Sequence, residues 1–256
     1  MIIDKLSYQS NLRYVNACEK TVFAVVTLLL CVTGRSIAIS VIVLAAMGFL
    51  TVKKGGTPFF RYVKLMTIPL AFLLMSTIAI IFNWSRTPLD AFALPIGSHF
   101  LTSSRASLFF GVQLILTALA GVSCLYFLSL STPMPDILMA LRTFRVPSLM
   151  VELMLLIYRF IFVLSEIAAA IRVSQDSRLG NRNFTTSCKS FGLLGSVLFV
   201  RAFAKSARLY DSMESRLYDG TVRVLTEQYP PKKKEIAGIL LFELLLAVLT
   251  IWRYCL

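Results

Sequence analysis

The sequence predicts an all-α, polytopic membrane protein with five transmembrane helices and a helical platform between the fourth and the fifth. Three observations lead to this prediction. The chain of 256 residues is 57% hydrophobic, and its mean hydropathy of +0.76 exceeds that of a typical soluble domain. Its apolar runs are long enough to cross a bilayer. Its 26 Lys and Arg residues, which give a net charge of +13, are concentrated between some of these runs and nearly absent between others.

Five apolar runs are the expected spans. They are Thr21–Thr33, Ile37–Val52, Leu65–Phe82, Ala106–Leu130 and Ile236–Trp252. The first two are separated only by Gly34-Arg35-Ser36 and should form a tight helical hairpin. Pro69 in the third is tolerated in a membrane helix as a kink. Asn83–Arg105 is expected to be a loop, and the Pro-rich, Lys-rich segment from Tyr229 to Lys234 is expected to be a linker before the last span.

Residues 131–235 should form the platform. Its expected elements are a short helix Asp136–Phe144 stopped by Pro147, a long helix Ser148–Arg178, a polar segment Asn181–Lys189, and Phe191–Val200 leading into a helix over Arg201–Gly220. The long helix is ambiguous, because Leu149–Ile171 is apolar enough to be a span. Glu152, Arg159 and Glu166 recur on one of its faces, and a charge at mid-bilayer costs about 2.5–3.5 kcal/mol. The alternative topology has two more spans, 149–171 and 186–200.

The distribution of positive charge favours five spans. Cytoplasmic loops carry an excess of Lys and Arg. With the N-terminus inside, Arg35, Arg86, Arg105 and Arg253 lie outside and the other 22 of the 26 basic residues lie inside. This topology divides the chain into a four-helix transmembrane region at 1–130, a cytoplasmic platform at 131–235 and a C-terminal transmembrane helix at 236–256, with the C-terminus outside.

A repeated motif marks two expected helix ends. Asp176-Ser177-Arg178-Leu179 is matched by Glu214-Ser215-Arg216-Leu217, and each copy is soon followed by a glycine, Gly180 or Gly220. Gly220 suits the left-handed turn that ends many helices. Each copy therefore places an arginine at a helix C-terminus, where the helix dipole favours a cation and the guanidinium can donate two hydrogen bonds to a partner. The helix leading to the second copy is amphipathic, with one apolar and one basic stripe.

Motifs of catalysis and metal binding are not found in the sequence. It has no Walker A motif, no G-x-S-x-G and no H-E-x-x-H, so we do not expect an enzyme. The five cysteines form no C-x-x-C pair, and with one histidine no metal site or cofactor is expected. Cys31 and Cys124, which lie in apolar runs, are expected to be packing residues. The basic stripe lacks interleaved aromatic residues, which argues against nucleic acid and is compatible with anionic lipid headgroups.

One acidic residue, Glu243, lies near the middle of the last expected span. A carboxyl group there is either a proton or cation site, or a neutral group packed against other helices. We favour the second interpretation.

The chain resembles the transmembrane T component of energy-coupling factor (ECF) transporters, of the CbiQ type. The resemblance covers essentially the whole chain and is strongest over residues 133–220. The matching stretches are Leu141-Arg142 with Arg145-Val146-Pro147, Tyr158-Arg159-Phe160, Arg178-Leu179-Gly180, and Met213-Glu214-Ser215-Arg216 with Asp219-Gly220. The family signature is usually Ala-Arg-Gly, and both copies here are Ser-Arg-Leu. The arginines are kept, but the third residue is bulkier.

The resemblance implies a non-enzymatic coupling subunit of a cobalt importer in a bacterial or archaeal cell membrane, a system that serves cobalamin biosynthesis. Two ABC ATPase subunits, CbiO-like, would dock on the platform. A separate CbiM-like membrane subunit, with or without a small CbiN-like subunit, would bind the substrate. The expected ATPase-coupling residues are Ser177, Arg178, Leu179, Ser215, Arg216 and Leu217. The alternative function is a stand-alone secondary transporter or channel with a site near Glu243.

Overall fold

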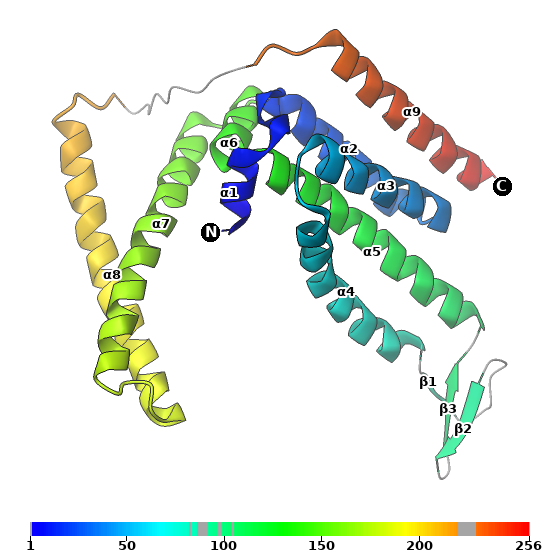
Figure 1. Ribbon diagram of the computed structural model, residues 1–256, viewed down its shortest axis with the longest axis horizontal. Coiled ribbons are helices and arrows are strands. Elements are labelled where there is room, and N and C mark those ends of the chain that lie inside the picture. The colour runs from blue at the N-terminus through cyan, green and yellow to red at the C-terminus, as the bar shows by residue number, and fades with distance from the viewer. Residues whose placement is uncertain are drawn as a thin grey trace. The chain divides into compact units, whose positions relative to one another are not determined.

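The computed structural model describes residues 2–81, 83–85, 92–96, 99–103, 105–219 and 229–255, which form two compact units (Figure 1). The first unit comprises Met1–Ala140 and Glu227–Leu256, and the second comprises Leu141–Thr226. The boundary falls within helix α6, Met134–Thr143, which matches the short helix predicted before Pro147.

The first unit is a helical bundle. Its elements are α1 (Ile2–Gln9), the 3-10 turn η1 (Asn11–Tyr14), α2 (Ala17–Gly34), α3 (Ile37–Phe49), the π-helical turn η2 (Leu50–Lys54), α4 (Phe59–Ile81), α5 (Arg105–Ser131), α6 and α9 (Lys233–Cys255). The Asn16 side chain accepts a hydrogen bond from the Cys18 amide and so caps the start of α2. Arg35, in the left-handed conformation, ends α2 and turns the chain into α3, as the predicted hairpin requires. Pro69 lies inside α4 as predicted.

A small antiparallel sheet lies in the stretch that we expected to be a loop. Its strands are β1 (Asn83–Ser85), β2 (Phe92–Ile96) and β3 (His99–Ser103), in the order β1-β3-β2. In the register, Ile96 is opposite His99, so two residues, Gly97-Ser98, separate the paired ends. A two-residue connection with glycine first is typical of β-hairpins, and this was the overlooked signal. The predicted helical class is otherwise confirmed for every candidate span.

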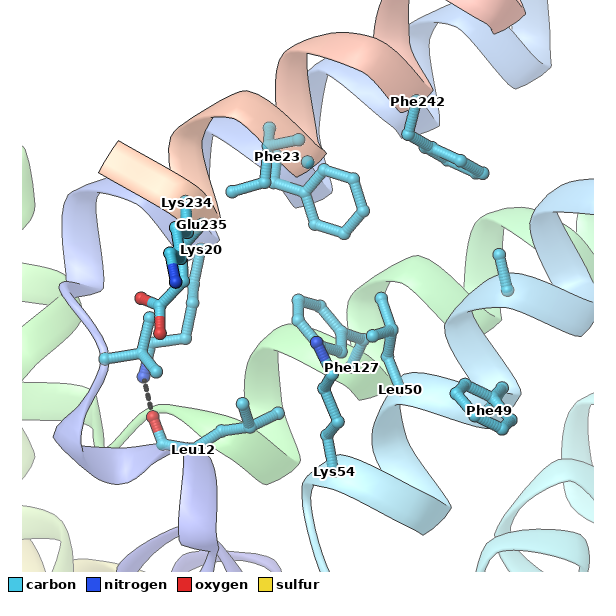
Figure 2. Close-up of a pocket in the computed structure, with 14 residues that line it drawn as sticks. Leu12, Lys20, Phe23, Phe49, Leu50, Lys54, Phe127, Lys234, Glu235 and Phe242 are labelled. Carbon is cyan, nitrogen blue, oxygen red and sulfur yellow. Dashed lines mark hydrogen bonds between the residues drawn. The ribbon is translucent and has the colours of Figure 1, made fainter. Parts of the chain in front are cut away.

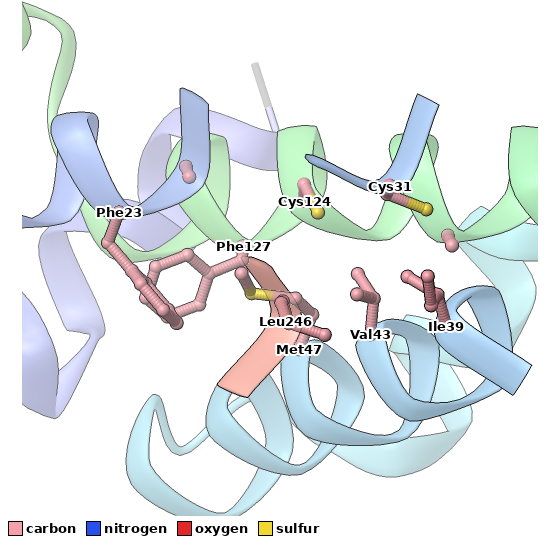
Figure 3. Packing of buried hydrophobic residues seen from close by; sticks show 10 residues of the cluster. Phe23, Cys31, Ile39, Val43, Met47, Cys124, Phe127 and Leu246 are labelled. Carbon is pink, nitrogen blue, oxygen red and sulfur yellow. The ribbon is translucent and has the colours of Figure 1, made fainter. Parts of the chain in front are cut away.

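The core of the first unit lies where α2, α3, α5 and α9 meet (Figure 3). Its fully buried members include Val43, Met47 and Leu246. Phe23 packs edge-to-face on Phe127, with ring centroids 5.8 Å apart. Cys31 and Cys124 are completely buried in this cluster as free thiols, so their predicted role as packing residues is confirmed.

The described residues contain seven helices long and apolar enough to cross a membrane: α2, α3 with η2, α4, α5, α7 (Ser148–Ser177), α8 (Phe184–Glu214) and α9.

The ends of three of these candidate spans lie together in the first unit. The Lys20 ammonium, near the start of α2, donates to the Ser131 carbonyl at the end of α5, 3.1 Å away. Lys20 and Lys234, at the start of α9, line one cavity (Figure 2). The end of α5 and the start of α9 therefore lie at the same end of the helical bundle. Between these two points the chain must cross a bilayer an even number of times or not at all.

The second unit is a hairpin of two long helices, α7 and α8. The predicted long helix over Ser148–Arg178 is confirmed by α7. Helix α8 begins at Phe184, earlier than the expected amphipathic helix, and ends at Glu214. Both helices expose large apolar side chains within this unit, among them Leu149, Ile157, Phe191 and Phe199. Large exposed apolar surfaces of this kind are typical of membrane or protein interaction sites.

Candidate functional site

The first copy of the repeated motif forms the end of α7. The Gly180 amide donates to the Gln175 carbonyl at 2.8 Å, and the Leu179 amide donates to the Asp176 carbonyl at 3.0 Å. Between them Leu179 adopts the left-handed conformation, with φ of 57°. This pair of hydrogen bonds around a left-handed residue is the Schellman motif, which satisfies the last carbonyls of a helix. Arg178 is the C-cap residue of α7.

The second copy forms the end of α8 with the same geometry. The Tyr218 amide donates to the Met213 carbonyl at 3.1 Å, the Leu217 amide donates to the Glu214 carbonyl at 3.0 Å, and Leu217 has a φ of 58°. We expected Gly220 to be the left-handed residue, and this was wrong. The left-handed residue is Leu217, because the Schellman hydrogen bonds form three residues earlier. Gly220 itself lies outside the described residues. The sequence repeat is thus also a structural repeat.

The family signature explains this geometry. The third residue of the motif occupies the left-handed position in both copies, and glycine adopts that conformation without steric cost. An L-residue there costs about 1–2 kcal/mol. Leucine in place of the usual glycine therefore adds strain but leaves the hydrogen-bonded helix end intact.

A third helix end in the second unit follows the same pattern. At the end of α6 the Val146 amide donates to the Leu141 carbonyl and the Arg145 amide donates to the Arg142 carbonyl, with Arg145 in the left-handed conformation at a φ of 64°. The sequence predicted a helix end here, before Pro147, but not that it repeats the geometry of the two Ser-Arg-Leu ends. The available signal was an arginine-rich helix end followed closely by a proline.

Each motif is fixed to the neighbouring helix by side-chain hydrogen bonds. At the first copy the Ser190 hydroxyl of α8 donates to the Gly180 carbonyl at 2.7 Å, and the Gln175 amide group donates to the Ser190 carbonyl at 2.8 Å. At the second copy the Tyr218 hydroxyl donates to the carboxylate of Glu152 in α7 at 3.1 Å. We call these contacts the two braces. Sequence reasoning missed them because their partners are 10 to 66 residues apart.

Glu152 was predicted only as a charge that argues against a membrane span, and the structure gives it a bonding partner. It is one of the three charges that recur along α7, and its side chain is 7% exposed and accepts a hydrogen bond from Tyr218. Loss of solvent contact and the hydrogen bond to Glu152 both raise the pKa of Tyr218 above its usual value. The hydroxyl therefore remains a proton donor at all physiological pH values.

The six predicted site residues divide into two kinds. The serines bond back into their own helices, Ser177 to the Val173 carbonyl and Ser215 to the Ser212 carbonyl. The arginines and leucines are exposed, Leu217 at 91%. Within the described part of the chain neither Arg178 nor Arg216 makes an ion pair. Each motif therefore exposes one guanidinium and one apolar side chain on a hydrogen-bonded helix end.

The alternative site at Glu243 has less support. One carboxyl oxygen of Glu243 in α9 is buried without a hydrogen-bond partner among the described residues. No group of three or more His, Cys, Asp or Glu side chains that could hold a metal ion occurs in the described ranges. An isolated carboxyl group is compatible with a packed, neutral acid.

We expect the third residue of the motif to tolerate glycine and to reject isoleucine. Leu217→Gly relieves the left-handed strain, whereas the β-branched side chain of Leu217→Ile makes that conformation a true outlier. Hydrogen exchange at the Tyr218 amide should stay unchanged or slow down in the first variant and accelerate at least about fivefold in the second, since about 1 kcal/mol or more is lost. Leu193→Gly in the middle of α8 is the control, where glycine should destabilise by about 1 kcal/mol. Destabilisation of the helix end by Leu217→Gly would contradict the assigned geometry.

Comparisons with known proteins point to one family. Residues 9–227 match the family model of CbiQ, described as cobalt transport protein. An uncharacterised protein of Methanocaldococcus jannaschii is 32% identical over 97% of this chain and 92% of its own length. The cobalt transport protein CbiQ of Salmonella typhimurium is 27% identical over 85% of this chain and 97% of its own. A protein of Methanocorpusculum labreanum described as a fused cobalt transport protein CbiMQ is 31% identical over 89% of this chain, which spans 38% of that longer relative.

Proposed function

The chain belongs to the CbiQ cobalt transport protein family, and on that premise we propose that it is the coupling subunit of an ECF-type ABC importer. It is a multi-pass membrane protein and a component of a transport system. In the proposed mechanism, ATP-driven closure of two ABC ATPase subunits moves α7 and α8, and these helices reorient a separate substrate-binding membrane subunit. The substrate is proposed to be the cobalt ion, and the membrane is the cell membrane of a bacterium or archaeon.

The observation that carries this proposal is the pair of identical helix ends. Two symmetric ATPases need two equivalent anchoring points, and the second unit has two Ser-Arg-Leu ends with the same backbone hydrogen bonds. Exposed Arg178 and Arg216 suit acidic or carbonyl-lined grooves, because a guanidinium donates two parallel hydrogen bonds in a fixed plane. The braces support the same role, since a helix end that transmits force must not move independently of its neighbour.

The relatives support a separate substrate-binding partner. The relative from Methanocorpusculum labreanum is described as a fused cobalt transport protein CbiMQ, so the two components are parts of one chain there. We infer that this chain is accompanied by a CbiM-like subunit, with or without a CbiN-like one, and by CbiO-like ATPases. The chain itself is proposed to have no catalytic residues.

Reconstitution tests this function. The chain in vesicles with the two ATPases and the CbiM-like subunit should take up cobalt only when ATP is present. Omitting the ATPases or the CbiM-like subunit should abolish ATP-dependent uptake. Cobalt uptake by the chain alone, driven by an ion gradient and lost in Glu243→Gln, would instead support the alternative of a secondary transporter with a site near Glu243.

The proposed topology has five spans, with α7 and α8 on the cytoplasmic side, and the three-part division at 1–130, 131–235 and 236–256 follows from it. The even number of crossings between α5 and α9 restricts the choice to five or seven. Native Cys188, exposed in α8, is a ready reporter. A membrane-impermeant maleimide should label an introduced Ser36→Cys in intact cells, but it should label Cys188 only after the membrane is opened. The label assigned to Cys188 should be missing in the Cys188→Ser variant. Labelling of Cys188 in intact cells would refute the topology with five spans.

A further inference from the structure

A cavity of about 680 Å³ lies in the first unit, and none of the six proposed coupling residues lines it (Figure 2). It lies between the start of α2, the end of α3 with η2, the end of α5 and the start of α9. Aromatic side chains make up much of its wall: Phe23, Phe49, Phe127 and Phe242. Its volume is in the range of about 300–1,000 Å³ that small-molecule sites occupy.

The charged residues of the cavity are mostly lysines. Lys20, Lys54 and Lys234 line it together with a single acid, Glu235. Lys20 is committed to the fold, because its ammonium donates to the carbonyls of Leu12 and Ser131. Lys54 and Lys234 make no ion pair with any described residue, while Glu235 lies 3.9 Å from Lys232. Two cationic groups are therefore available to an anion, and Figure 2 shows the Lys54 side chain running from η2 toward the Phe127 ring.

The order of these residues along their helices matches the layers of a bilayer. Lys54 ends η2, and Lys234 is the second residue of α9. The apolar lining residues lie further along the same helices, which are candidate spans: Phe49 precedes Lys54 by five residues and Phe242 follows Lys234 by eight. The backbones of Lys54 and Lys234 therefore lie closer to the headgroups than those of Phe49 and Phe242.

Small residues keep the cavity open. A Cβ atom added to Gly238 in α9 would have no heavy atom within 4 Å. Ala46, on the α3 wall, is also small. Because Gly238 lines the cavity, a side chain at position 238 would begin in open space beside it.

We propose that this cavity is a binding site for one anionic phospholipid. Lys54 and Lys234 hold the phosphate, and one acyl chain lies along Phe49 and Phe242. The choice of occupant follows from charge complementarity, since an apolar groove in a bilayer would accept any lipid tail, but free ammonium groups at its mouth select an anionic headgroup.

Native mass spectrometry of the purified full-length protein tests this proposal, with phosphatidylglycerol and phosphatidylcholine added in equal amounts. The wild-type protein should retain phosphatidylglycerol preferentially. Lys54→Gln should reduce that retention about fivefold, which corresponds to the loss of one basic contact. Gly238→Leu should abolish it by filling the cavity. Lys53→Gln, in the same turn but not in the cavity, and Gly192→Leu, at another glycine with open space around it, are the matched controls and should retain the lipid.

Three results would overturn the proposal. They are equal retention of both lipids, undiminished retention of phosphatidylglycerol in Lys54→Gln, and a Gly238→Leu protein that keeps its lipid but no longer co-purifies with a membrane partner. The last result would mean that a partner helix fills the groove. Because Lys54 is exposed, its variant should fold normally, and the test remains decisive even if Gly238→Leu fails to fold.

Discussion

Replacing both Arg178 and Arg216 by alanine is expected to abolish ATP-dependent uptake and to prevent co-purification of the ATPases. In the proposed complex each guanidinium makes charge-assisted hydrogen bonds in a desolvated groove. Losing one partner of such a contact costs about 2–5 kcal/mol, in part because the facing group is left unpaired. Either single variant should weaken assembly, and the double variant should be far worse, since no anchored helix end remains.

Two sets of control variants accompany this experiment. Lysine at the two positions separates the effect of charge from that of guanidinium geometry, and alanine at another arginine tests whether the effect is specific to the two motifs. Lysine at both positions should rescue only partly, because it keeps the charge and loses the planar fork. Arg201→Ala, an exposed arginine in the middle of α8, should assemble and transport normally. Normal assembly and uptake in the double alanine variant would show that the two arginines only cap their helices.

Tyr218→Phe should release the second motif from α7. The substitution removes the hydroxyl that donates to Glu152 and leaves a buried carboxylate without that partner. A hydrogen bond to a charged group contributes about 1.5–3 kcal/mol. Hydrogen exchange at the Leu217 and Tyr218 amides should therefore accelerate about tenfold or more, and uptake should fall while membrane levels stay normal.

A second tyrosine of α8 provides the control for this brace. Tyr210 is 62% exposed, so Tyr210→Phe should change neither exchange nor uptake. Glu152→Gln should be milder than Tyr218→Phe, because the amide oxygen still accepts the hydroxyl hydrogen. Equal behaviour of Tyr218→Phe and Tyr210→Phe would mean that the hydrogen bond to Glu152 does not hold the helix end.

Local sequence patterns predicted most of the helices and both arginine-bearing ends. Apolar run length gave the spans, and the repeat of acid-Ser-Arg-Leu gave the two ends, because both signals depend only on neighbouring residues. The left-handed leucines could not be predicted in the same way. The rule for a Schellman motif favours glycine, and Gly180 and Gly220 were available nearby. The residue in the left-handed position was decided by hydrogen bonds at the helix end.

Contacts between distant residues were not predictable. The braces join Gln175 to Ser190 and Glu152 to Tyr218, and the lysine cavity joins residues from the start of α2, the end of η2 and the start of α9. No periodic pattern marks such pairs. Hydropathy alone also cannot separate five spans from seven, because α7 and α8 are long and apolar enough to be candidate spans although α7 carries regularly spaced charges.

Site-specific cross-linking tests the central claim most directly. Ser177 and Ser215 are exposed and adjacent to the two arginines, so each can be replaced by cysteine in a Cys188→Ser background within the assembled transporter. Both positions should form cross-links to an ATPase subunit with a short bifunctional reagent, whereas Ser206→Cys, eight residues before the end of α8, should not. Cross-linking from Ser206→Cys but from neither helix end would contradict the assignment of the two Ser-Arg-Leu motifs as the coupling site.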